Sequence, residues 1–308
     1  MGKIKILVSG LLSYDSGKTT VAKYLAKILR EKGFDIGVSK PVAGHSLWLQ
    51  PYTYEYSMSY KKLVGEDVVE LKKYSGSNDS IEMINPLNMA TLPLDPLKFL
   101  TIDLYYNNMS MINTYKLAVI SRLTRCVSKD YVETTHLIIE DRYRLLSDSL
   151  RRSIDKLSTN LEPKPEPVSS EEFYKKILEA SIDTDRCLEI LEDKHEFLII
   201  ESFNDVASPN IYSLKSDLVL IIAPGRVFIY SGERFREVFK MILYIDSLEK
   251  IDYTNISTWP LSKDLVRYIR EIDSIEIPHI LDRDLFIDSI YRLSDKILSL
   301  LSYKQYSK

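Results

Sequence analysis

Short apolar runs alternate with helical patterns at the start of the chain and predict a parallel α/β sheet. "KIKILVS" is short, apolar and rich in β-branched residues, which is typical of a buried strand. From Thr19 onward apolar residues recur at helical spacing, and Gly33 is expected to end that helix. "FDIGVSK" (34–40) indicates a second strand. A strand, a helix and a strand within so short a stretch form a βαβ unit, which favours a parallel sheet.

The second half of the chain repeats this alternation. "EFLIIES" (196–202) and "DLVLIIAP" (217–224) are predicted to be buried strands. "GERFREVFKMILYI" has the spacing of an amphipathic helix, "SIEIPHIL" indicates an edge strand, and "DLFIDSIYRLSDKILSLL" predicts a closing helix. These segments extend the same α/β sheet.

The middle of the chain, residues 101–168, lacks this regular alternation. "KLAVISRLTR" and "THLIIEDRYRLL" are expected to pair as a hairpin, and "SDSLRRSIDKL" predicts a helix after it. We interpret 101–168 as an insertion within one domain that spans residues 1–308.

The composition of the chain argues against nucleic-acid-binding, membrane-spanning and disulfide-rich proteins. The chain has 308 residues, 45% of them hydrophobic, so it can bury a sizeable core. Its net charge of -3 gives no bulk reason to expect a nucleic-acid partner, and it has no apolar stretch of the roughly 18 residues that a membrane span needs. Cys126 and Cys187 are too few for a disulfide framework and are expected to be thiols in a reducing compartment. The sequence therefore predicts a cytoplasmic protein with no membrane partner.

The segment "SGKTT" follows the first predicted strand and opens the first predicted helix. Phosphate binding needs converging backbone N–H groups, a lysine that neutralises charge, and a hydroxyl that holds Mg²⁺ at a helix N-terminus. Ser16, Gly17, Lys18, Thr19 and Thr20 supply these groups in the required order. We expect Lys18 to contact the terminal phosphates of a nucleotide and Thr19 to bind Mg²⁺.

The glycine spacing departs from the standard P-loop. The standard motif would place its first glycine at position 12, but Leu12 stands there and the nearest earlier glycine is Gly10. The longer loop also carries an acid, Asp15, two residues before Gly17. Together with "GVSKPVAGHS" further on, this loop resembles that of dethiobiotin synthetase and cobyrinic acid a,c-diamide synthase. The resemblance covers less than half of the chain.

The resemblance implies a doubly wound, mostly parallel P-loop NTPase fold and an ATP-dependent reaction on a second substrate. In the family the lysine of the Lys-Pro-Val segment, here Lys40, faces the substrate carboxyl or carbamate and the transferred phosphate. Asp67, in "GEDVVELKKYSG", is by resemblance a second Mg²⁺ candidate. Asp15 is expected to bind the metal or to orient an amine or hydroxyl of the substrate. The catalytic candidates are therefore Lys18, Lys40 and Asp15.

Two glutamates compete for the role of the acid at the end of a core strand. Glu201 ends "FLIIE" and Glu140 ends "HLIIE". An acid at the carboxyl end of a buried strand is expected to hold Mg²⁺ or to position water in an open α/β sheet. Glu201 is preferred because the next predicted core strand follows it closely. The metal candidates are Thr19, Glu201 and Asp67.

Other polar and aromatic residues follow the Lys-Pro-Val segment. His45 could act as an acid or base, although a histidine in a loop is more often a polar contact. A cluster of tyrosines could form a stacking wall for an acceptor or pack together as loop aromatics: Tyr52, Tyr54, Tyr56 and Tyr60.

Three functions stay open on the sequence. The first is a Mg²⁺-dependent P-loop ATPase, a ligase- or synthetase-like enzyme that phosphorylates a small carboxylate or carbamate of unknown identity. The second is a regulatory ATPase or GTPase switch with 101–168 as a partner surface. The third is a polynucleotide 5′-hydroxyl kinase, for which "DSGK" is also typical but the acidic balance is unfavourable. The absence of an Asn/Thr-Lys-x-Asp motif favours ATP over GTP, and a homodimer is left open.

Overall fold

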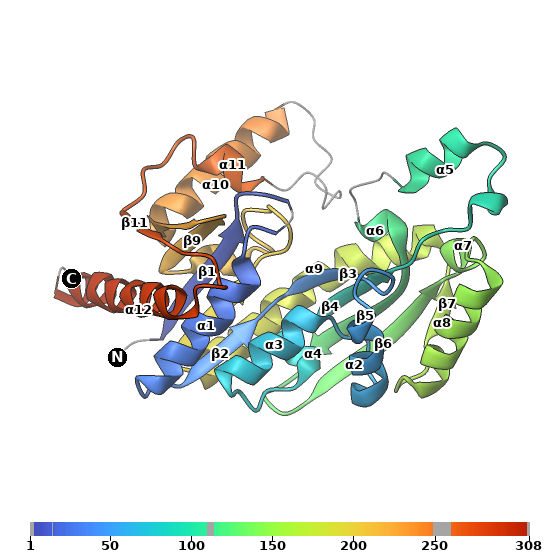
Figure 1. Cartoon of the computed structure of the whole chain (residues 1–308), viewed down its shortest axis with the longest axis horizontal. Coiled ribbons are helices and arrows are strands. Elements are labelled where there is room, and N and C mark those ends of the chain that lie inside the picture. The colour runs from blue at the N-terminus through green and yellow to red at the C-terminus, as the bar shows by residue number, and fades with distance from the viewer. Residues whose placement is uncertain (1–2, 14, 110–113, 249–259, 307–308) are drawn as a thin grey trace. The chain divides into compact units, whose positions relative to one another are not determined.

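The chain divides into two compact units, each with its own β-sheet (Figure 1). The computed structural model describes residues 3–13, 15–109, 114–248 and 260–306. The first unit comprises Met1–Ser39, Glu70–Asp79 and Leu191–Lys308, and the second comprises Lys40–Val69 and Ser80–Ile190. The expected insertion, 101–168, falls within the second unit, which extends beyond it on both sides.

The described part of the first unit contains a six-stranded sheet of order β11-β10-β9-β1-β8-β2. Its strands are β1 (Ile4–Gly10), β2 (Ile36–Ser39), β8 (Phe197–Glu201), β9 (Leu218–Ala223), β10 (Arg226–Ser231) and β11 (Asp273–Glu276). β1 pairs in parallel with β8 and β9, and β8 pairs in parallel with β2. β10 and β11 add an antiparallel edge. The predicted strands at both ends of the chain are confirmed, although β11 covers only the first residues of the predicted edge strand "SIEIPHIL".

β10 was not predicted, because it follows β9 through a very tight turn. Ala223 pairs with Arg226, so only Pro224 and Gly225 separate the two strands. Gly225 has φ 81, in the left-handed region that glycine adopts without strain. The Pro-Gly pair looks like the end of a strand in the sequence, but here it is the turn of a hairpin.

Helices of the first unit confirm the predicted periodic segments. They are α1 (Lys18–Glu31), α10 (Gly232–Leu248) and α12 (Arg283–Tyr306). The short α11 (Ser262–Leu265) and a 3-10 turn at Tyr212–Lys215 were not predicted. α1 ends just before Gly33, as expected. Its Tyr24 ring lies edge-on to Phe286 of α12 at 5.2 Å between centroids, so these two helices pack side by side.

The described part of the second unit contains a five-stranded mixed sheet of order β3-β4-β5-β6-β7. Its strands are β3 (Val42–Ser46), β4 (Leu87–Thr91), β5 (Ala118–Cys126), β6 (Val132–Ile139) and β7 (Glu166–Val168). β3 is parallel to β4, β5 is antiparallel to β4 and β6, and β7 is parallel to β6. The predicted hairpin is the β5–β6 pair, while β3, β4 and β7 were not predicted because each is short.

Helices α2 and α8 are the main helices whose residues all belong to the second unit. α2 spans Tyr52–Tyr60 and α8 spans Asp148–Asn160, which confirms the helix predicted after the hairpin. Ile154 and Leu157 of α8 are fully buried in a core with Ala90 of β4 and Ile120 of β5. Shorter helices are α4 (Ile81–Ile84), α5 (Ile102–Met109), α6 (Thr114–Leu117), α7 (Glu140–Tyr143) and a 3-10 turn at Pro96–Lys98. α3 (Glu66–Ser75) and α9 (Ser170–Lys194) have residues in both units.

The expectation of two free thiols is wrong. Cys126 at the end of β5 forms a disulfide with Cys187 of α9, with 5.1 Å between their Cα atoms. The two residues lie 61 positions apart, and only the packing of α9 beside β5 brings them together. Disulfides occur in oxidising compartments and also inside the cells of hyperthermophiles. The two cysteines therefore give no support to a cytoplasmic location, which stays a prediction.

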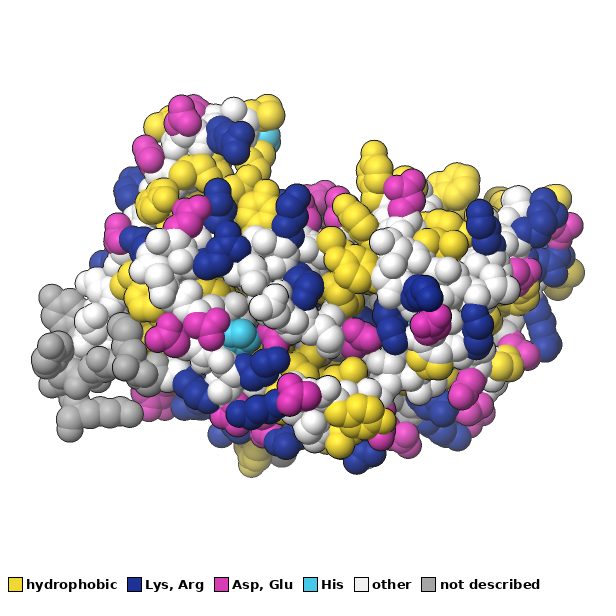
Figure 2. All heavy atoms as spheres, turned by 90° about the horizontal axis from the view of Figure 1, so that it is seen from below, with side chains coloured by type: hydrophobic (Ala, Val, Ile, Leu, Met, Phe, Trp, Pro, Cys, Tyr) yellow, Lys and Arg dark blue, Asp and Glu magenta, His cyan; other side chains and the backbone are white. Residues whose placement is uncertain are grey.

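Two surface properties bear on partners. None of the described helices has the length and apolar character that crossing a membrane requires. On the face seen in Figure 2, lysine and arginine side chains alternate with aspartate and glutamate rather than forming one continuous basic stripe. The expectation of no nucleic-acid partner stays a prediction.

Candidate functional site

The phosphate-loop segment lies between β1 and α1, in the strand–loop–helix context that such a loop requires. Gly17 immediately precedes α1 and has φ 87, in the left-handed region. As a glycine, it has no side chain that could cap the first N–H groups of α1. Backbone N–H groups of this kind bind phosphate oxygens at helix N-termini.

Gly10 accounts for the unusual glycine spacing. A Cβ at this position would lie 2.6 Å from Ser16 Oγ, 2.8 Å from Lys18 Nζ and 3.1 Å from the backbone oxygen of Asn204. A side chain at the end of β1 would therefore displace the groups that fold back over it. The early glycine makes room for the lysine of the loop.

Lys18 and Ser16 are packed together in the loop. Lys18 Nζ donates a hydrogen bond to Ser16 Oγ at 3.2 Å, and both residues are buried. The ammonium group is thus held over the end of β1, next to the first turn of α1. This is where charge neutralisation of a bound phosphate would be needed.

Thr19 and Glu201 meet at the carboxyl end of the sheet. Thr19 Oγ1 donates a hydrogen bond of 2.7 Å to Glu201 Oε1, and Glu201 is only 1% exposed. Glu201 ends β8, whose parallel pairing with β1 aligns it with Val8. A hydroxyl and a carboxylate oxygen are hard ligands of the kind that Mg²⁺ prefers, so these two residues fit a Mg²⁺ site.

Glu140, the alternative strand-end acid, has a different environment. It begins α7 in the second unit, its side chain is 42% exposed, and it pairs with Arg144 at 2.6 Å. Glu201, at the end of β8, is therefore the strand-end acid that contacts the hydroxyl of the loop.

Asp15 and Thr20 complete the predicted loop contacts. Asp15 is exposed and has φ 50, a left-handed backbone that aspartate tolerates better than most non-glycine residues. Thr20 lies half-buried in the first turn of α1. Asp15 therefore lies exposed in the loop, and Thr20 lies just after it in the helix.

Lys40 and Asp67 form a second group, within the second unit. Lys40 is 5% exposed, and its ammonium forms a short ion pair with Asp67 in the first turn of α3. The predicted catalytic lysine and the second predicted metal acid therefore contact each other. Lys18, Thr19 and Glu201 come together in the first unit, and Lys40 and Asp67 come together in the second.

Two residues that the sequence did not single out hold the backbone of Lys40. Asn85 Nδ2 donates to the carbonyl of Lys40 at 2.6 Å, and Arg122 Nη2 donates to the carbonyl of Asn85 at 2.7 Å. Arg122 is fully buried, and burial lowers its pKa to about 10. An arginine inside an apolar strand pattern was the only signal in the sequence that could have revealed this support.

His45 is a core residue of β3 and not part of a loop. Burial lowers its pKa to about 4; Lys40 and Arg122 act in the same direction, and Asp67 opposes them. Neither ring nitrogen has a hydrogen-bond partner among the described residues. The imidazole is therefore neutral near pH 7, and the expected polar contact is absent from the described structure.

Comparison with known proteins gives one partial relationship. The chain is 34% identical over 80 residues to the ATP-dependent dethiobiotin synthetase BioD of Methanococcus vannielii. The match covers 26% of this chain and 29% of that protein, less than a third of either. No family model matches the chain, and no solved structure matches it. At this coarse level the match supports a relationship to P-loop NTPases and a nucleotide-binding enzyme.

Proposed function

We propose that the protein is a Mg²⁺-dependent P-loop ATPase that phosphorylates a small carboxylate or carbamate, as a ligase- or synthetase-like enzyme. The observation that carries this proposal is the hydrogen bond between Thr19 and Glu201 beside the buried ammonium of Lys18. These three groups are the ones that a nucleotide triphosphate and its metal require. The partial match to an ATP-dependent synthetase favours a synthetase over other P-loop enzymes.

In the proposed nucleotide site, each residue has one task. Lys18 neutralises the terminal phosphates, and Ser16 orients the ammonium of Lys18. Thr19 and Glu201 would hold Mg²⁺, and the ion would supply positive charge that offsets the negative charge of the phosphates during transfer. Gly17 and Thr20 contribute contacts from the loop and from the first turn of α1.

In the proposed acceptor chemistry, Lys40 binds the carboxylate or carbamate. An acceptor oxygen attacks the γ-phosphorus, a new O–P bond forms, and the bond from that phosphorus to ADP breaks. The product is an acyl phosphate, whose carbonyl an amine then attacks with release of phosphate. Asp67 pairs with the ammonium of Lys40 and orients it before the acceptor arrives, and Asp15 would bind the metal or orient the amine.

We also propose a domain organisation, partners and a location. The chain is a single P-loop NTPase domain spanning 1–308, with the first unit as its doubly wound core and 101–168 as an insertion. The partners are a nucleotide, ATP rather than GTP, and an unidentified small acceptor. A cytoplasmic location and a homodimer stay predictions.

The decisive test is ADP release with ATP and Mg²⁺ over a panel of small carboxylates, and amines supplied with bicarbonate. A member of the panel should stimulate release in the wild type and in Lys27→Ala, a control at a half-buried lysine on α1 that pairs with Glu31. Lys18→Ala should lose nucleotide turnover, whereas Lys40→Ala should keep nucleotide binding and lose only the stimulation.

The same assay separates the other two functions. Stable association with a protein only in the presence of a non-hydrolysable nucleotide, with no stimulation by any acceptor, would favour a regulatory switch. Transfer of labelled phosphate to an RNA 5′-hydroxyl would favour the kinase. If Lys40→Ala retains full stimulation by the acceptor, its assigned role is wrong.

A further inference from the structure

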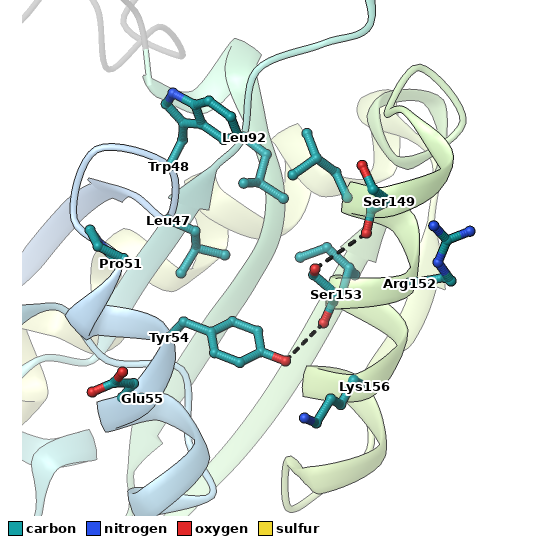
Figure 3. A pocket seen from close by; sticks show the side chains of 12 residues that line it. Leu47, Trp48, Pro51, Tyr54, Glu55, Leu92, Ser149, Arg152, Ser153 and Lys156 are labelled. Atoms are coloured by element: carbon teal, nitrogen blue, oxygen red, sulfur yellow. Dashed lines mark hydrogen bonds between the residues drawn. The ribbon is translucent and has the colours of Figure 1, made fainter.

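A cavity of about 600 Å³ lies within the second unit, between α2 and α8 (Figure 3). Leu47 follows the last residue of β3 and Leu92 follows the last residue of β4, so the cavity opens at the carboxyl ends of two parallel strands. Ligands of α/β proteins typically bind at this edge of a sheet. The volume is within the range of small-molecule sites.

The inner surface of the cavity is apolar. Leu47, Leu92 and Ile154 line it and are buried in the core of the unit. Tyr54 of α2 spans the cavity, and its hydroxyl donates to the backbone oxygen of Ser153 on α8 at 3.3 Å. Tyr54 belongs to the tyrosine cluster seen in the sequence, and this contact holds the two helices at a fixed separation.

Trp48 lies at the rim of the cavity with 62% of its surface exposed. An indole ring beside an apolar hollow is a large hydrophobic surface with a polar N–H, and such rings are common where ligands or partners bind. Its exposure means that a molecule in the cavity could pack against the ring without rearrangement of the core.

The charges around the cavity favour an anion. Arg152 and Lys156 of α8 line it, against one acid, Glu55 of α2. In Figure 3 the side chain of Lys156 extends toward α2, whereas Arg152 points to the outer side of α8. Among the residues that the structure describes, Lys156 forms no ion pair, so its ammonium is available to a ligand.

We propose that this cavity binds a small amphipathic organic anion. Its apolar body lies on Leu47, Leu92 and Tyr54 beneath the indole of Trp48, and its acidic group faces Lys156. Lys40 precedes β3 and Leu47 follows it, so a five-residue strand of roughly 16 Å separates them. The cavity is therefore a second ligand site, distinct from the Lys40–Asp67 pair, and it does not depend on the proposed reaction.

Trp48 offers a direct measurement of binding. The chain has two tryptophans, so Trp259→Phe leaves Trp48 as the single tryptophan reporter. Octanoate, octylammonium and octanol share one apolar chain and differ in charge. We expect octanoate to shift the emission of Trp48 and to bind about tenfold more tightly than octylammonium, because a single lysine attracts one and repels the other.

Two variants test whether Lys156 binds the acidic group of the ligand. Lys156→Gln should weaken octanoate binding about fivefold and leave octanol binding unchanged. Lys129→Gln, at an exposed position in the turn between β5 and β6, should change neither. The proposal is overturned if octanoate at about 10 mM leaves the emission unchanged, if both charged ligands bind equally, or if Lys156→Gln binds octanoate as the wild type does.

Discussion

The hydroxyl of Thr19 donates a hydrogen bond to the carboxylate of Glu201 across 182 positions of the sequence. Thr19 lies in the first turn of α1, which follows β1, and Glu201 is the last residue of the neighbouring strand β8. Because β1 and β8 are parallel neighbours, a residue at the start of the helix after one strand meets the last residue of the other. This contact is the geometric basis of the proposed metal site.

Glu201→Gln should lower ADP release by roughly 100-fold, since the amide keeps the hydrogen bond to Thr19 but loses the charge that holds the metal. Measured against Mg²⁺ concentration, the variant should also require more metal for half-maximal rate. Glu140→Gln is the matched control and should behave as wild type. The opposite outcome, a loss with Glu140→Gln alone, would return the role to Glu140.

Gly10→Ala should weaken nucleotide binding at least tenfold, because its methyl group would displace Ser16 and Lys18. Titration with a fluorescent ATP analogue measures this directly. Gly33→Ala is the control: its Cβ would meet nothing within 4 Å, but φ 95 makes it strained by about 1 kcal/mol. Gly33→Ala should lose stability without losing affinity for the ATP analogue. Equal nucleotide affinities for the wild type, Gly10→Ala and Gly33→Ala would contradict the role of Gly10.

Acid should destabilise the protein through two buried histidines. Burial lowers the pKa of His45 and of His136 to about 4, against an unfolded value of about 6.5. The unfolded chain therefore binds more protons below pH 6.5, and stability should fall between pH 6.5 and 4 by up to roughly 3 kcal/mol for each histidine. Urea unfolding at pH 7.5 and pH 5 measures the change.

His195 acts in the opposite direction. Burial lowers its pKa, but hydrogen bonds with Asp79 and Asp35 outweigh burial and raise it. Its stabilising contribution is complete below the unfolded pKa and is lost as pH rises through the folded pKa.

His45→Leu should reduce the loss of stability at acid pH, and the exposed His279→Gln should not. If His45→Leu leaves the acid dependence unchanged, His45 is not buried as a neutral group.

Loss of the disulfide should destabilise the protein. Closing a loop of 61 residues restricts the unfolded chain, so Cys126→Ser/Cys187→Ser should lower the free energy of unfolding by roughly 4 kcal/mol. Urea unfolding of the oxidised protein, the reduced protein and the double variant tests this. The reduced protein and the double variant should have the same free energy of unfolding. Two titratable thiols in the native oxidised protein would show that the bond is absent.

The predictable elements are those with strong local signals. The runs that became β1, β8 and β9 are short, β-branched and completely or almost completely buried, and α1 lies between Gly17 and Gly33. β3 was missed because it has only five residues and includes Gly44 and His45. The 25-residue helix α9, which ends just before His195 and β8, was also missed.

By itself the sequence determined the strand–loop–helix context of "SGKTT", because that context depends on neighbours within a few positions. The preference for Glu201 came from the core strand that follows it in the chain. Only the tertiary structure decided that Glu201 contacts Thr19, that Lys40 pairs with Asp67, and that Cys126 bonds to Cys187. These contacts join residues 182, 27 and 61 positions apart. Strand order and helix packing bring such residues together, and no pattern of period two or 3.6 carries that information.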